Sequence, residues 1–162
     1  MNQIEKAQVA YENFPVQFGS IILSTVDAEG LPNASYTPFV MDEEKRIYIY
    51  VSGLATHTKN IYANPKVSVL FIEDESQTKQ IFARRRLSFD CDPNLLTRDT
   101  PQWLEIVDKF QEKFGEIIEM LRSLPDFRIF QLTPTRGRFV VGFGAAYQIS
   151  GDNLNQLTQI TN

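Results

Sequence analysis

Residues 47–60 read Ile-Tyr-Ile-Tyr-Val-Ser-Gly-Leu-Ala-Thr-His-Thr-Lys-Asn, and this stretch guides the interpretation of the rest of the chain. The alternating apolar run at 47–51 predicts a β-strand, and residues 61–65 predict a short helix closed by an Asn-Pro pair. A strand-to-helix junction offers free backbone N–H groups and a positive helix end, which suit a phosphate group. The alternative is that Thr56 or Thr58 simply caps a surface helix, as Ser and Thr commonly do.

The junction also concentrates polar side chains that could bind a ligand: Ser52, Thr56, His57, Thr58 and Lys59. His57 is the only histidine in the chain. It could act as a general acid or a heme ligand, but no second histidine accompanies it, so a structural role as a donor at the helix end is the favoured interpretation. No metal-binding cluster is predicted.

Composition narrows the class of protein. The chain has 162 residues, which fits one domain over 1–162, and 43% of them are hydrophobic, enough for a substantial core. A net charge of −4 argues against a general nucleic-acid-binding protein. A single cysteine, Cys91, excludes an internal disulfide framework, and without a base beside it in sequence we expect it to be inert. No membrane span or secretion signal is recognisable, so a cytoplasmic location is expected.

Short β-branched and aromatic runs separated by turn residues predict a meander of antiparallel strands. A short amphipathic helix is expected within 1–14, before Pro15. One of the strands carries three consecutive arginines, and alternation predicts that Arg84 and Arg86 share a face, with Arg85 on the other. The strands are expected at 20–26, 32–40, 46–51, 66–72, 80–89, 127–133 and 136–141.

One long amphipathic helix is expected over 101–124, because its apolar residues recur at helical spacing. Thr100 is a suitable N-cap, Pro101 fits the first helical position, and Trp103 should be buried. Residues 148–162 are expected to form a C-terminal tail, of which the polar part from Gly151 onward could also be an edge element. The pattern predicts a mainly β (α+β) fold, an antiparallel barrel with flanking helices, although periodicity alone does not separate a barrel from a sandwich.

The order of several segments resembles the pyridoxamine-phosphate-oxidase-like, FMN-binding split barrels, and within them the heme-iron-utilisation branch. The resemblance runs from about residue 14 to about residue 147. It is carried by GLPNASYTPF at 30–39, YVSGLATHTKN at 50–60, Asn64-Pro65, ARRRL at 83–87 and FVVGFGAAY at 139–147.

This resemblance implies an antiparallel split β-barrel that forms a homodimer with cofactor sites at the subunit interface. The FMN phosphate would be bound by Ser52, Thr58 and Lys59 with help from the arginine strand, and residues 33–36 would lie along the flavin ring. Tyr36 could stack on the ring, whereas packing is favoured for Tyr50. The resulting cofactor-binding candidates are Asn33, Ser35, Tyr36, Ser52, Thr56, His57, Thr58, Lys59, Arg84 and Arg86.

Three departures from the family pattern leave alternatives open. Many flavin-binding members have an arginine near the position of Asn33. Heme-degrading members take their axial histidine from near the C-terminus, whereas no histidine follows Gly142 here, and Ala145 replaces an arginine. The leading hypothesis is an FMN-binding protein that acts as a flavin-dependent oxidoreductase on an unknown substrate. The alternatives are a heme-binding or heme-degrading protein and a cofactor-free interaction protein; no catalytic residue is identified.

Overall fold

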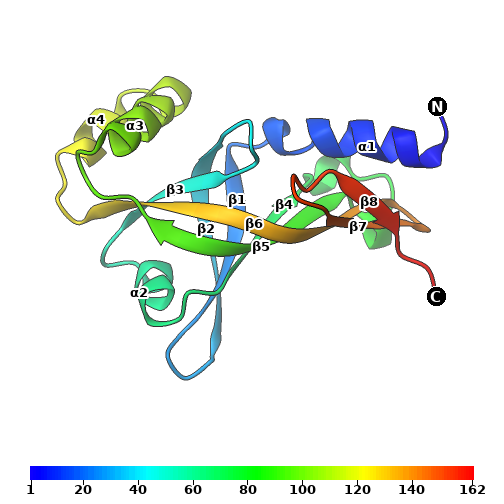
Figure 1. The fold of residues 1–162 in the computed structure, drawn as a ribbon, viewed down its shortest axis with the longest axis horizontal. Coiled ribbons are helices and arrows are strands. Elements are labelled where there is room, and N and C mark those ends of the chain that lie inside the picture. The colour runs from blue at the N-terminus through cyan, green and yellow to red at the C-terminus, as the bar shows by residue number, and fades with distance from the viewer.

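In the computed structural model, which describes residues 1–162, eight antiparallel strands form one sheet in the order β3-β2-β1-β4-β5-β6-β7-β8 (Figure 1). An additional pairing between β3 and β6 joins the two ends of the six-strand part into a barrel. The predicted antiparallel split barrel with flanking helices is confirmed. The strands are β1 Ser20–Val26, β2 Pro32–Met41, β3 Ile47–Ser52, β4 Val67–Ile72, β5 Arg86–Leu95, β6 Phe127–Gly142, β7 Ala145–Ser150 and β8 Gln156–Gln159.

Four α-helices flank the barrel: α1 Gln3–Asn13, α2 Thr56–Ala63, α3 Pro101–Phe114 and α4 Ile117–Arg122. In Figure 1, α3 and α4 lie beyond one end of the sheet, α2 lies below it, and α1 runs along the opposite end towards β7 and β8. None of these helices has the length and apolar character needed to cross a bilayer. Short 3-10 turns occur at Pro15–Gln17, Glu75–Gln77 and Ile81–Ala83.

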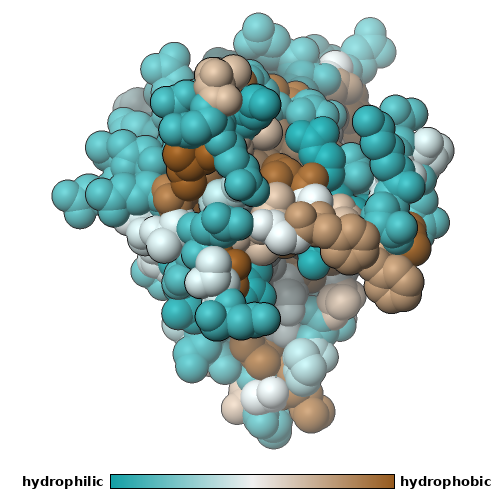
Figure 2. All heavy atoms as spheres, turned by 90° about the vertical axis from the view of Figure 1, so that its right-hand side faces the viewer, coloured by the Kyte–Doolittle hydropathy of each residue, from teal (hydrophilic) through white to brown (hydrophobic).

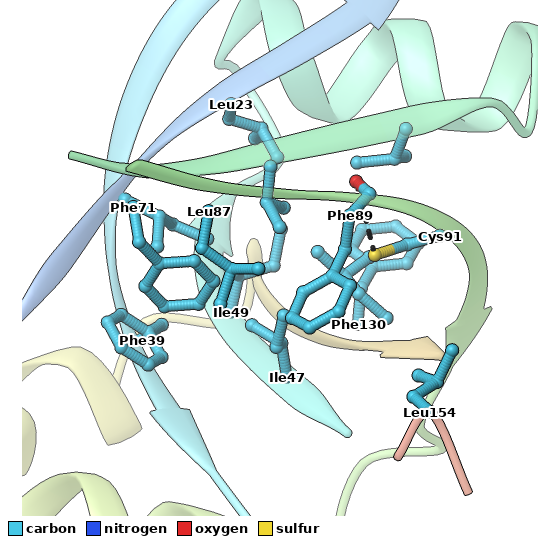
Figure 3. Close-up of a cluster of buried hydrophobic side chains, with 14 of the residues drawn as sticks. Leu23, Phe39, Ile47, Ile49, Phe71, Leu87, Phe89, Cys91, Phe130 and Leu154 are labelled. Carbon is cyan, nitrogen blue, oxygen red and sulfur yellow. Dashed lines mark hydrogen bonds between the residues drawn. The ribbon is translucent and has the colours of Figure 1, made fainter. Parts of the chain in front are cut away.

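The barrel interior is filled by side chains from alternate positions of each strand (Figure 3). In β1, for example, Ile21 and Leu23 are buried while the intervening residues point outward. In this core Phe71 packs edge to face against both Phe39 and Phe89. The quadrupoles of the rings favour this geometry, which also buries apolar area. Alternation along each strand therefore separates an apolar interior from an outer surface.

A second apolar cluster lies outside the barrel, between β3 and the α3–α4 pair. Tyr50 packs edge to face against Trp103, and both side chains are almost fully buried. The Thr100 side chain accepts a hydrogen bond from the Trp103 N–H, with Pro101 at the start of α3. The predicted N-cap, the buried Trp103 and the packing role of Tyr50 are confirmed.

Several element boundaries differ from the predictions. The helix expected over 101–124 is two helices, because Gly115 adopts a φ of 81° that ends α3. The strands expected at 127–133 and 136–141 are the single strand β6, which passes Pro134 at a register shift against Asp90 and Cys91. The C-terminal tail expected at 148–162 contains the end of β7 and all of β8, and the Tyr11 hydroxyl donates to the Leu154 carbonyl at 2.8 Å.

Candidate functional site

The loop after β3 is held to the start of β6. The Ser52 hydroxyl donates to the Asp126 carboxylate at 3.1 Å and accepts the Leu54 N–H at 3.1 Å. The Gly53 N–H donates to the Asp126 carbonyl at 2.7 Å. The Ser52 hydroxyl is therefore already hydrogen-bonded to a carboxylate. It could donate to a phosphate only if it released Asp126. Sequence reasoning did not identify Asp126, which is 74 residues away in the chain.

Helix α2 begins earlier than predicted, at Thr56 rather than near residue 61. Its N-cap is Ala55, with no side-chain capping bond, so the prediction that Thr56 or Thr58 caps the helix is wrong. The N–H groups of Thr58 and Lys59 donate to the Ala55 carbonyl. Those of Thr56 and His57 precede these first helical bonds and face out of the helix start. This end of α2 retains the donors that an anion would use.

The Thr58 hydroxyl has unusual surroundings for a polar group. Thr58 is fully buried, and its hydroxyl has no hydrogen-bond partner. Lys59, the next residue, is exposed, as is Thr56. The three candidate side chains therefore diverge, since one is covered by the barrel and two face solvent.

Beneath α2, polar side chains join the helix to the barrel. Nδ1 of His57 lies 2.9 Å from the Ser35 hydroxyl, and the Asn60 amide donates to the Thr25 hydroxyl at 3.1 Å. Burial lowers the pKa of His57, so its imidazole is neutral at pH 7. Asn33 pairs with Thr25 across β1 and β2 and is half-buried nearby. The predicted candidates Ser35 and His57 are thus in direct contact.

The three consecutive arginines have three different environments. Arg84 precedes β5 and donates through Nε to the Glu73 carbonyl at 2.7 Å, with Glu75 at 3.5 Å from its guanidinium. Arg86 starts β5 and donates to the Arg84 carbonyl at 2.8 Å. The prediction that residues 80–89 form one alternating strand is wrong, because Ile81–Ala83 forms a 3-10 turn capped by the Gln80 side chain.

The arginines and the loop after β3 do not meet within one protomer. Ser52 pairs with Phe127 at the start of β6, whereas Arg86 pairs with Val140 near its end. Thirteen residues of strand separate these positions, or roughly 40 Å along an extended strand. One copy of the chain therefore does not bring Arg84 or Arg86 to the start of α2.

The outer side of the barrel carries a continuous row of side chains across six strands. Tyr36 and Ile22, which are 61% and 41% exposed, begin it. Because these positions alternate with buried ones, the row lies on the outer surface. We call it the outer row: Tyr36, Ile22, Leu70, Ser88, Arg138 and Gln148, each in register with the next. The sequence contains a signal for the outer row, because the apolar residues Ile22 and Leu70 occupy strand positions that face outward.

Comparisons with known proteins agree with this architecture. Residues 8–141 match the family model described as pyridoxamine 5'-phosphate oxidase. The chain is 48% identical over 132 residues to the heme oxygenase HutZ of Vibrio cholerae, which covers 82% of this chain and 74% of that protein.

Solved structures show the same fold. The crystal structure of HutZ, described as the heme storage protein of Vibrio cholerae, has a TM-score of 0.74 at 39% identity and covers 86% of this chain and 95% of that one. Campylobacter jejuni ChuZ has a TM-score of 0.86 at 33% identity over 96% of this chain, which spans 63% of the ChuZ chain. The barrel, its residue pattern and these matches show that the chain belongs to the pyridoxamine 5'-phosphate oxidase family, on its heme-utilisation branch.

Proposed function

We propose that this protein binds heme and serves in heme utilisation, with heme degradation as its activity. The observation that carries the proposal is the 48% identity to the heme oxygenase HutZ over 82% of the chain. The HutZ structure is described as that of a heme storage protein. Binding of heme is common to both descriptions. The proposal therefore has two parts, which are heme binding and degradation of the bound heme.

The outer row has the chemistry that the organic part of heme needs. A porphyrin is a flat apolar disc with two carboxylates, so it suits apolar side chains bordered by guanidinium groups. Ile22, Leu70 and Tyr36 supply the apolar part, and Arg138 is an exposed cation in the same row. Arg86 lies two residues from Ser88 along β5 and could reach the same carboxylates. Bound heme would supply the iron that activates oxygen in a heme oxygenase.

His57 is the candidate iron ligand among the residues of this chain. Its imidazole is held in the neutral form, which is the form that ligates iron, and Nδ1 is engaged with Ser35, so Nε2 remains for a ligand. However, Ser35 alternates with Tyr36 along β2, so His57 and the outer row lie on opposite sides of that strand. His57 of the same protomer would therefore not reach a disc lying on the outer row.

A homodimer would resolve this separation, and we propose that two copies associate through the outer row. The exposed apolar side chains on this face support the proposal. So does the distance within one copy between Arg86, which pairs near the end of β6, and the start of α2, which follows the strand residue Ser52 that pairs at the start of β6. A second copy could place its cations or its α2 beside the first copy's outer row. The cytoplasmic location expected from the sequence remains a prediction.

FMN is the second candidate ligand, because its phosphate could use the first N–H groups of α2. The Asp126 carboxylate beside Ser52 opposes an anion there. Flavin-dependent oxidoreductase chemistry and the cofactor-free interaction protein remain the alternative hypotheses.

Absorption spectra of the purified protein, titrated separately with hemin and FMN, test these alternatives. The proposal expects a Soret band that survives desalting and saturates with hemin. It further expects that Arg138→Gln weakens hemin binding by about tenfold, because a charge-assisted contact to a carboxylate is lost. Lys66→Gln is the matched control, since Lys66 is an exposed cation outside the outer row.

A saturable flavin spectrum without hemin binding would show that the protein binds FMN and not heme. Binding of neither ligand would favour the cofactor-free alternative. For turnover, hemin-loaded protein given a reductant and oxygen should lose its Soret band as product forms, whereas a stable band would leave heme storage as the function.

A further inference from the structure

A cavity of about 570 Å³ lies at the end of the molecule where α1, the 73–85 segment and the β6–β7 turn meet. This end faces the viewer in Figure 2, where apolar side chains are exposed among hydrophilic ones. The volume lies within the range of sites for small organic ligands. None of the cofactor-binding candidates predicted from the sequence lines this cavity.

The cavity has an apolar wall and a cationic rim. Its apolar wall is made by Ala7, Ala10, Ala83, Val141 and Tyr147. Lys6, Lys79 and Arg85 contribute positive charge, against the single carboxylate of Glu73. The protein as a whole carries a net charge of −4, so this local excess of cations is opposite in sign to the rest of the molecule.

The guanidinium of Arg85 is the central feature of the cavity. Arg85 is half-buried, and its guanidinium forms no ion pair, whereas the neighbouring Arg84 pairs with Glu75. The contact to Glu73 is made by the backbone N–H of Arg85, at 3.1 Å from the carboxylate. The guanidinium lies 5.7 Å from the ring centre of Phe14, which fixes its position against an apolar surface. Arg85 thus presents donors to the cavity without a protein acceptor that uses them.

The lining also excludes some ligands. It contains no histidine, cysteine or methionine, so it offers none of the usual side-chain ligands of heme iron except the phenol of Tyr147, which is buried. Arg85 and Arg86 also diverge, since Arg85 lines the cavity beside α1 and Arg86 begins β5. No residue of the outer row lines the cavity, so the two are separate.

We propose that this cavity binds a small amphipathic anion, a compact apolar body bearing one carboxylate or sulfonate. The apolar body packs against the alanines and Val141, and the acid group accepts hydrogen bonds from Arg85 with Lys79 and Lys6 nearby. Phe143, which is 73% exposed at the rim, can add an apolar contact to the bound molecule. The site goes beyond the proposed heme function and requires neither heme nor a second copy.

The test is a titration of the 15N-labelled full chain with 2-naphthoate, followed by amide NMR shifts. The expected result is saturable shifts confined to the cavity, including Ala83, Gly142 and Phe143. Uncharged 2-naphthalenemethanol, which keeps the ring system without the carboxylate, should bind at least about tenfold more weakly, because the charge-assisted hydrogen bonds are lost. Arg85→Gln should weaken naphthoate binding by about tenfold or more for the same reason.

Two further variants make the outcome decisive. Lys79→Gln alters an exposed side chain, so it tests the cationic rim even if Arg85→Gln fails to fold, and it should weaken naphthoate binding measurably. Arg138→Gln, on the outer row, should leave naphthoate binding unchanged. Equal binding of acid and alcohol, shifts centred on the outer row, or no saturation at millimolar naphthoate would overturn the proposal. Hemin titration of the same samples reports separately on the heme proposal.

Discussion

Nδ1 of His57 lies 2.9 Å from the hydroxyl of Ser35, so the first turn of α2 is joined to the middle of β2. The imidazole is partly shielded from water, and this burial lowers the pKa of His57 below its ordinary value of 6.5. The neutral ring is therefore part of how α2 docks on the barrel.

This contact predicts a dependence of stability on pH. Because the folded pKa lies below 6.5, the unfolded chain takes up the proton at a higher pH than the folded chain. The stabilisation is present above that value and is lost as the pH falls through the lower folded pKa. We expect urea unfolding from about pH 7 to about pH 5 to show a loss of stability in the wild type that is smaller in His57→Gln, with a slope from one proton of at most about 1.4 kcal/mol per pH unit. Parallel curves for the two proteins would show that His57 does not titrate differently on folding.

Gly53 is required by the close approach of Arg128 to the loop after β3. A Cβ at this position would clash with Nη1 of Arg128, and it would lie 3.0 Å from the Asp126 carbonyl oxygen. Arg128 would then lose its hydrogen bond to that carbonyl and its position over the Tyr62 ring. We expect Gly53→Ala to destabilise the protein by about 1–3 kcal/mol, as overpacking does.

Gly19→Ala is the control for that substitution, since its Cβ would meet only Phe114, at an ordinary contact distance of 3.9 Å. Chemical denaturation of both variants gives the comparison. If Gly53→Ala is no less stable than Gly19→Ala, the loop has room to move away from Arg128.

Lys113 links α3 to the barrel through two backbone carbonyls. Its ammonium donates to Phe39 at 2.8 Å and to Phe18 at 3.2 Å, and it lies 4.2 Å from the ring centre of Phe39. We expect Lys113→Met to lower the free energy of unfolding by about 1–2 kcal/mol, because two charge-assisted hydrogen bonds are lost. Lys109→Met should change it by less than about 0.5 kcal/mol, because that lysine makes a distant surface pair with Glu105. Urea denaturation at neutral pH measures both, and similar losses would contradict a specific role for Lys113.

The barrel and α3 were predictable because their signals are local. Alternation over residues 20–26 and 67–72 marks strands, and Thr100-Pro101 marks the start of α3. Alternation failed at 80–85, where the Gln80 side chain caps the Phe82 N–H and favours a 3-10 turn over a strand. Pro134 suggested a break in β6, but the register shift opposite Cys91 accommodates it.

The sequence indicates candidate site residues but not how they are arranged. Ser35 and His57 were both candidates, yet their contact depends on how α2 docks on the barrel. The pairing of Ser52 with Asp126 and the different surroundings of Arg84, Arg85 and Arg86 depend on contacts between distant parts of the chain. Periodicity contains no information about such contacts.

Cys91 should be unreactive in the folded protein, as expected from the sequence. The side chain is buried in the barrel core, and burial raises the pKa of its thiol above its ordinary value. We expect little reaction with Ellman's reagent in native buffer and one equivalent of released thiolate in guanidinium chloride. Rapid reaction of the native protein would indicate that the core opens at Cys91 on the time scale of the assay.

The outer row gives a direct test of the proposed homodimer. Leu70 lies between Ile22 and Ser88 in this row, with its side chain on the outer surface of β4 rather than in the core. Leu70→Glu would place two carboxylates in the apolar part of a symmetric interface, where like charges and desolvation oppose association. Val16→Glu is the matched control, because Val16 is a 78% exposed apolar residue outside the row. Sedimentation equilibrium should show a dimer for the wild type and Val16→Glu and a folded monomer for Leu70→Glu, with folding checked by circular dichroism. A dimer that persists in Leu70→Glu would place the interface on another face, and a wild-type monomer at micromolar concentration would exclude a cofactor site that needs two copies.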